Sequence, residues 1–165
     1  MSIEFLITTL IIVVAPGTGV IYTIGTGLAQ GRSASALAAF ACTLGIVPHL
    51  AAAMLGLADV LHASALVFNA IKYVGILYLL YMAWQCLRDR GVLNVESGGA
   101  RRPGWKILRD GILVNVLNPK LSIFFVAFLP QFIRPDDAAP MWSMLGLSGG
   151  FMLMTFVVFI FYGLF

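Results

Sequence analysis

Five apolar segments, each long enough to cross a lipid bilayer as a helix, dominate this chain. A membrane-spanning helix needs roughly 20 mostly apolar residues, and the segments lie at about residues 5–28, 37–58, 66–87, 112–133 and 142–165. Hydrophobic residues make up 61% of the chain and charged residues 10%, whereas soluble domains contain about 45–50% and about 25%. These proportions exclude a soluble domain and a disordered chain. They predict an all-α polytopic bundle of membrane helices.

One sizeable polar stretch, residues 88–111, interrupts this single membrane domain of residues 1–165. It separates a first three-helix repeat, residues 1–87, from a shorter second repeat, residues 112–165. Six of the ten lysine and arginine residues lie in the stretch: Arg88, Arg90, Arg101, Arg102, Lys106 and Arg109. Because basic loops remain in the cytoplasm, we expect residues 88–111 to be cytoplasmic and the N-terminus to lie outside.

A proline interrupts the first and the fourth segment at equivalent places. Pro16 and Pro119 are 103 positions apart, and the same spacing superimposes the second segment on the fifth. The second copy starts three segments after the first. Because this number is odd, the second copy inserts upside down, as in the inverted repeats of secondary transporters. Proline removes the hydrogen bond to the carbonyl four residues earlier, here that of Ile12 or Asn115. An unmet carbonyl is costly in hydrocarbon, so the two breaks are either packed kinks or parts of a shared site.

The residues around these prolines are the candidates for substrate binding. They are Pro16, Gly17, Thr18, Gly19, Asn115, Asn118, Pro119 and Lys120. A half-helix that starts after the first proline would present its first N–H groups to a cavity, and such a helix terminus suits a carboxylate. The two asparagine amides either satisfy the freed carbonyls or face the substrate. Lys120 either pairs with a substrate carboxylate or extends to lipid phosphates.

His49, in the middle of the second segment, is the remaining ionisable candidate. It relays a proton or bonds a substrate, or else it is an interhelical hydrogen-bond donor. The sequence has no motif for ATP hydrolysis, nucleophilic catalysis, a metal or a cofactor, and its small basic excess does not indicate nucleic-acid binding. We therefore expect no enzyme, and transport would draw on a proton gradient or on the substrate gradient.

Several stretches of the chain resemble the lysine exporter (LysE/RhtB) family of amino-acid efflux proteins. These are Pro16–Gly17, Gly31–Arg32, Leu55–Ala58, Ile71–Tyr81, Asn118–Lys120, Phe124–Phe125 and Phe128–Phe132. The resemblance implies a six-span, oligomeric exporter in the inner membrane, closest to the homoserine, threonine or leucine type and coupled to the proton gradient. The family usually has a second proline and then a polar residue where this chain has Thr18 and Gly19.

The resemblance also implies that a sixth span is missing, because this chain ends at Phe165 within its fifth segment. An alternative interpretation therefore stands beside export. The chain is then an inactive truncated membrane fragment, or a half-assembly that needs a partner helix.

Overall fold

The structure is a computed structural model, and it describes residues 1–62, 69–70, 73–78, 80–81, 84, 102–134 and 136–165. This part of the chain is helical and contains no strand. Its elements are α1 (Ile3–Val14), α2 (Thr18–Gln30), α3 (Arg32–Leu44), α4 (Val47–His62), α6 (Gly104–Val116), α7 (Pro119–Ile123), the π-helix η1 (Phe124–Phe128), the 3₁₀-helix η2 (Leu129–Phe132) and α8 (Pro140–Leu164). The predicted all-α membrane bundle is confirmed.

Two of the predicted spans are bent helix pairs. α1 and α2 meet at 52°, and α6 meets the segment Pro119–Phe132 at 48°. Each pair is apolar and long enough to form one span. The segment Arg32–Gly56, which covers α3 and part of α4, and the helix α8 are also apolar and long enough to form one span each. Half of the third predicted span, residues 66–87, lies outside the described residues, as do residues 88–101 of the predicted polar stretch.

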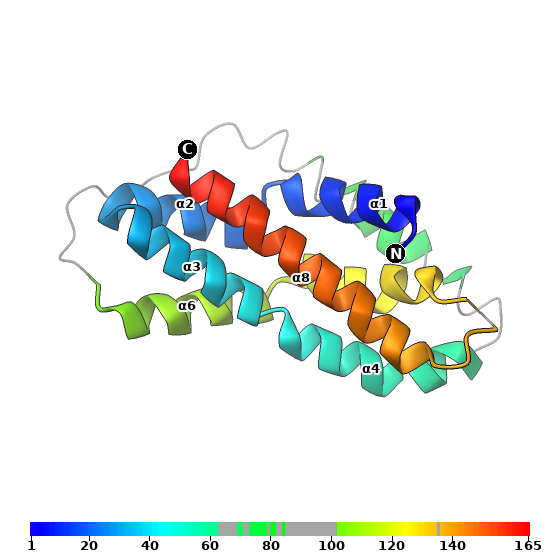
Figure 1. Cartoon of the computed structure of the whole chain (residues 1–165). Coiled ribbons are helices and arrows are strands. Elements are labelled where there is room, and N and C mark those ends of the chain that lie inside the picture. The colour runs from blue at the N-terminus through cyan, green and yellow to red at the C-terminus, as the bar shows by residue number, and fades with distance from the viewer. Residues whose placement is uncertain (63–68, 71–72, 79, 82–83, 85–101, 135) are drawn as a thin grey trace.

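The two bent pairs run in opposite directions along the bundle (Figure 1), as an inverted repeat requires. α8 crosses both of them, and α3 packs against α2, α6 and α8. Small side chains allow this close approach, since a Cβ atom added to Gly111 of α6 would lie 2.6 Å from the Cβ of Ala41 in α3. Close backbone packing through small residues is typical of membrane helices.

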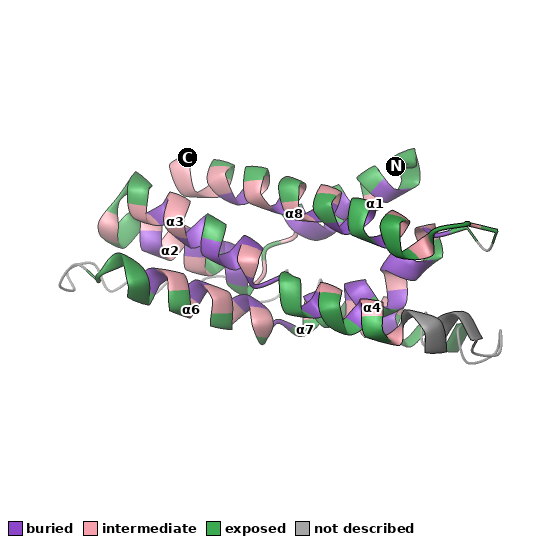
Figure 2. Cartoon of the chain, turned by 60° about the horizontal axis from the view of Figure 1, so that its bottom comes forward, coloured by how far each residue is buried: buried purple, intermediate pink, exposed green. Residues whose placement is uncertain are grey.

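An aromatic cluster joins the second bent pair to α8. The ring centroids of Phe124 and Phe151 are 4.5 Å apart, and Phe125 packs edge-on against Phe151. Figure 2 shows buried residues on the inward faces of the helices and exposed residues on the outward faces. The outward faces carry large apolar side chains such as Ile11 and Leu153, which suits contact with lipid.

The helix that contains the predicted fourth span begins before residue 112, because α6 starts at Gly104. Hydropathy detects only the part of a helix that lies in hydrocarbon, and the first turns of α6 are polar. Their charged side chains surround Trp105, with Lys106 and Arg109 over its ring, a composition typical of a membrane–water interface. The other described spans agree with the predicted ends within about five residues.

A third break, at Gly45–Ile46 between α3 and α4, was not predicted. The N–H of Ile46 donates to the carbonyl of Thr43 instead of that of Cys42. The second span is therefore interrupted near its middle, and the carbonyl of Cys42 loses its helical partner.

Candidate functional site

The first break leaves carbonyl groups at the end of α1 that a lysine from the other repeat satisfies. Pro16 has no N–H for the carbonyl of Ile12. The Nζ atom of Lys120 donates to the carbonyl of Ile12 and to that of Ala15, both at 2.9 Å. The side chain therefore joins α7 to the end of α1, and it does not extend to the lipid surface.

The helix that follows the first break starts without a side-chain cap. Its N-cap residue is Gly17, which has no side chain to accept a hydrogen bond. The first N–H groups of a helix have no acceptor within the helix, and the helix dipole makes this end partly positive. A Cβ atom added to Gly17 would lie 3.3 Å from Nζ of Lys120, so a helix start and an ammonium group lie side by side.

The second break is closed by a histidine. Pro119 has no N–H for the carbonyl of Asn115; this carbonyl accepts instead from the N–H of Asn118 at 3.0 Å and from Nε2 of His49 at 2.9 Å. A carbonyl only accepts, so Nε2 carries the hydrogen. Nδ1 of the same ring is 3.1 Å from the hydroxyl of Ser122. His49 thus acts as an interhelical donor, one of the two roles expected for it.

The two asparagines complete the closure of the second and third breaks. The side-chain oxygen of Asn118 accepts from the N–H of Lys120 at 3.0 Å and so caps α7. Nδ2 of Asn115 donates to the carbonyl of Cys42 at 2.6 Å, the group freed at Gly45–Ile46. Each of the three breaks is therefore closed by a side chain from another helix.

A cavity of about 20 Å³ lies between the first and second breaks. Its lining residues are Ile12, Val13, Gly17, Gly19, Val20, Asn115, Asn118, Lys120, Leu121, Phe151, Thr155 and Phe159. No acidic side chain is among these described residues. A water molecule needs about 10–15 Å³ of such volume, so the cavity can hold about one water and is too small for an amino acid.

Most of the predicted site residues meet at this cavity. Those that line it are Gly17, Gly19, Asn115, Asn118 and Lys120. Those that do not line it are Pro16, Thr18 and Pro119, which are exposed, and the buried His49. Sequence reasoning missed the contribution of α8, from which Phe151, Thr155 and Phe159 come. The one signal for it was the hydroxyl of Thr155 within an apolar segment.

Known proteins resemble this chain over nearly its whole length. The family model described as LysE type translocator matches residues 10–165. An uncharacterized membrane protein of Vibrio cholerae serotype O1 is 33% identical over 147 residues, which cover 88% of this chain and 72% of that protein. A homoserine/homoserine lactone efflux protein of Salmonella typhi is 28% identical and a leucine efflux protein of Enterobacter sp. (strain 638) is 29% identical. These matches cover 81% and 94% of this chain, which spans 65% and 76% of those two proteins. No solved structure matches the chain.

Proposed function

Because this chain belongs to the LysE type translocator family, we propose that it exports small neutral amino acids of the homoserine, threonine or leucine type across the inner membrane. Two relatives are efflux proteins for homoserine and its lactone and for leucine. We propose that the proton gradient drives export and that the chain catalyses no chemical conversion of the amino acid.

The observation that carries this proposal is the start of α2 without a side-chain cap, at a cavity that both repeats line. A substrate carboxylate would accept hydrogen bonds from the first N–H groups of α2, at Gly17, Thr18 and Gly19, where the helix dipole favours an anion. Asn118 and Lys120 approach the same cavity from the other repeat. Because the cavity is too small for an amino acid, substrate entry requires the two repeats to move apart, as they do in alternating access.

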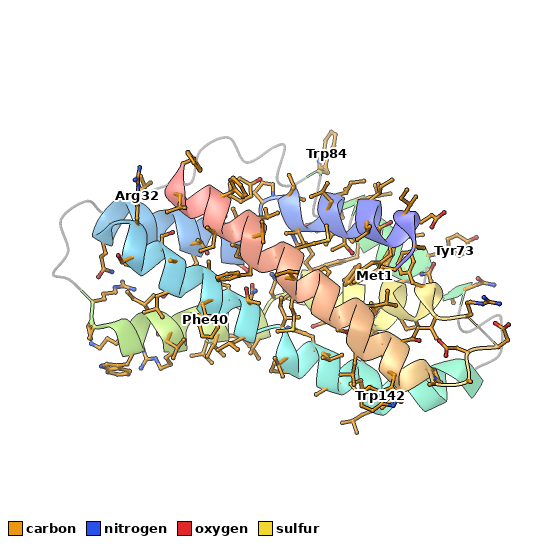
Figure 3. All side chains as sticks on the ribbon, viewed as in Figure 1. Met1, Arg32, Phe40, Tyr73, Trp84 and Trp142 are labelled. Carbon is orange, nitrogen blue, oxygen red and sulfur yellow. The ribbon has the colours of Figure 1, made fainter. Side chains whose placement is uncertain are left out.

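The ends of the bundle support the proposed orientation, with the N-terminus outside. Basic side chains gather where α2 ends and α3 and α6 begin, which is also the end that holds Arg32 (Figure 3). Gln30 accepts from the N–H of Arg102 at 2.7 Å and joins these elements. Met1 and Trp142 lie at the opposite end, near the acidic turn before α8. By the positive-inside rule the basic end is cytoplasmic.

A proton relay through His49, the other role predicted for this residue, stays a prediction. Its protonation would require only that the hydroxyl of Ser122 turn from donating to accepting, while the bond from Nε2 to Asn115 persists. Assembly into a homo-oligomer, which the family resemblance implies, stays a prediction.

An efflux assay tests the proposed function. Cells are loaded with leucine, threonine or homoserine, and efflux is compared between the wild-type chain, Pro16→Ala and an empty vector, with Gly25→Ala as a matched control on α2. We expect faster efflux with the wild type than with the empty vector. Gly25→Ala should match the wild type, because a Cβ atom at Gly25 meets nothing within 4 Å. Pro16→Ala should slow efflux, because it restores a hydrogen bond across the break.

Equal efflux from all four strains would contradict the transport proposal. The alternative, a half-assembly that needs a partner helix, would then be tested by co-expressing the last helix of a longer relative. Efflux that appears only on co-expression supports that alternative.

A further inference from the structure

The end of α1 is a cation site that Lys120 fills. Two carbonyls of the broken helix, those of Ile12 and Ala15, each accept from its Nζ atom at 2.9 Å. The carbonyl of Val14, the residue before Ala15, accepts from the hydroxyl of Tyr162 at 2.8 Å. Carbonyls at the C-terminal end of a broken membrane helix, where the dipole is negative, are a recurring place for coupling cations.

The dipole of α7, the helix that carries Lys120, does not stabilise the positive charge of this side chain. Lys120 is the second residue of α7, and the positive end of a helix dipole disfavours a cation there. The contact with α1 compensates for this, because it places the ammonium at the negative end of another helix. A local rule broken in this way, with its compensation in a different repeat, is typical of functional positions.

The first break also matches an amino-acid zwitterion. The carbonyls that end α1 and the uncapped N–H groups that start α2 are separated by only a three-residue break, Ala15–Gly17. An amino acid carries its ammonium and its carboxylate on one carbon atom. The first group suits the end of α1, and the second suits the start of α2. In the closed conformation the place for the ammonium is occupied by Lys120.

We propose that Lys120 is the proton-binding group that couples export to the proton gradient, because its ammonium and the substrate ammonium compete for the carbonyls of Ile12 and Ala15. This inference rests on the proposed export function. On the cytoplasmic side Nζ releases one proton to water, and the substrate ammonium takes over the two hydrogen bonds. On the outer side, where protons are more concentrated, Nζ takes up one proton and displaces the substrate. Each cycle exports one neutral zwitterion and admits one proton, so one positive charge moves inward.

Other titratable groups on the described elements around Lys120 do not line the cavity. They include Glu4 on α1, Tyr22 on α2, Cys42 on α3, His49 on α4, Asp110 on α6 and Tyr162 on α8, together with the basic side chains of Arg32, Lys106 and Arg109. Tyr162 reaches the end of α1 through its bond to the carbonyl of Val14, and its hydroxyl serves as a donor there. Among these described residues, Lys120 is the ionisable side chain that contacts the carbonyls of Ile12 and Ala15.

Transport in proteoliposomes tests this assignment with two variants of the full chain. Leucine and homoserine are the probes, and both their exchange and their net flux driven by a pH difference are measured. Lys120→Arg keeps a cation that does not release its proton, so we expect it to lose both activities by more than about tenfold. Lys120→Gln keeps N–H donors for the carbonyls but no charge, so we expect exchange to slow, because Lys120 lines the cavity, and the response to the pH difference to disappear.

If Lys120 has a purely structural role, both variants should keep the wild-type pH dependence, because arginine and glutamine both supply donors to the two carbonyls. Wild-type pH dependence in either variant overturns the assignment while leaving export intact. A wild-type chain that neither binds nor exchanges either amino acid contradicts the proposed function, and this inference with it.

A second measurement covers the case in which a variant fails to fold. Leucine is added to the purified wild-type chain in weakly buffered detergent solution, and proton release is recorded. We expect about one proton for each leucine bound, and none on addition of the 2-hydroxy analogue, which lacks the ammonium group. Leucine binding without proton release overturns the assignment.

Discussion

The break between α1 and α2 and the break between α6 and α7 bend the chain by similar angles, 52° and 48°. They differ in what closes them. At the first, the ammonium of Lys120 donates to two carbonyls of the helix that ends there. At the second, the imidazole of His49 donates to one carbonyl, that of Asn115.

The helices that start after the two breaks differ as well. α7 is capped by the side chain of Asn118, whereas α2 starts at Gly17 without a side-chain cap. The two prolines thus determine where the chain bends, and the neighbouring side chains determine what each bend can bind. Both breaks are closed by side chains, but the first has a helix start without a side-chain cap and a carbonyl pair that accepts from an ammonium group, whereas at the second the helix start is capped.

The largest effect is expected from filling the space at the first break. A Cβ atom at Gly19 would lie 2.6 Å from Oδ1 of Asn115 and 2.8 Å from the ring of Phe159. Overpacking of this kind costs about 1–3 kcal/mol, so Gly19→Ala should lower the rate of efflux by about tenfold or more. Gly25→Ala on the same helix meets nothing within 4 Å and should transport at the wild-type rate. Equal rates for the two variants would show that the first break tolerates filling.

A smaller effect, mainly on stability, is expected at the second break. His49→Leu removes one of the two donors to the carbonyl of Asn115 and leaves the N–H of Asn118, which should lower the free energy of unfolding by about 1–2 kcal/mol. His49→Gln keeps a donor and should lose about 1 kcal/mol or less. Thermal unfolding in detergent measures both. A loss of proton-driven efflux in His49→Gln, with exchange intact, would instead make His49 the coupling residue.

The cap of α7 should contribute about 1 kcal/mol. Asn118→Ala removes the acceptor for the N–H of Lys120, and loss of such a cap typically costs about 1 kcal/mol. Asn118→Ser retains a cap of similar strength and should unfold at nearly the wild-type temperature. If the two variants unfold at the same temperature, the capping bond does not stabilise the second break.

The smallest effect lies outside both breaks, in the turn before α8. Two hydrogen bonds, from the hydroxyl of Ser143 and from the N–H of Ala139, hold the pKa of Asp137 below its usual value, and the nearby positive charge of Arg134 lowers it further. A lowered pKa in the folded state adds stability above the unfolded pKa, about 3.9, and this stability is lost as the pH falls through the folded pKa. Thermal unfolding between about pH 6 and about pH 3 should show a slightly weaker acid dependence for Ser143→Ala than for wild type, with transport unchanged.

The sequence predicted the positions of the first and second breaks because proline removes a hydrogen bond wherever it lies in a helix. The break at Gly45–Ile46 could not be predicted in the same way, since it lies before Pro48 and not at it. A proline in the first turn of a helix is well tolerated. Hydropathy likewise missed the polar start of α6 at Gly104.

The candidate site could be predicted as a set of residues but not as a set of contacts. Asn115, Asn118 and Lys120 were identified because polar groups are rare in apolar segments. The partners of Lys120 come from the other repeat, 108 and 105 positions away, and depend on how the two bent pairs lie against each other. No local pattern at Ile12 or Ala15 indicates that their carbonyls bind a cation.

Substrate binding to a pair of proline variants tests most directly whether the first break binds substrate while the second is structural. Binding of radiolabelled leucine and homoserine to purified protein is compared for wild type, Pro16→Ala and Pro119→Ala. Each variant restores a backbone N–H within reach of a carbonyl, that of Ile12 or that of Asn115. We predict that Pro16→Ala loses binding by more than about tenfold and that Pro119→Ala stays within about threefold of wild type. Equal losses in the two variants, or a larger loss in Pro119→Ala, would contradict the account.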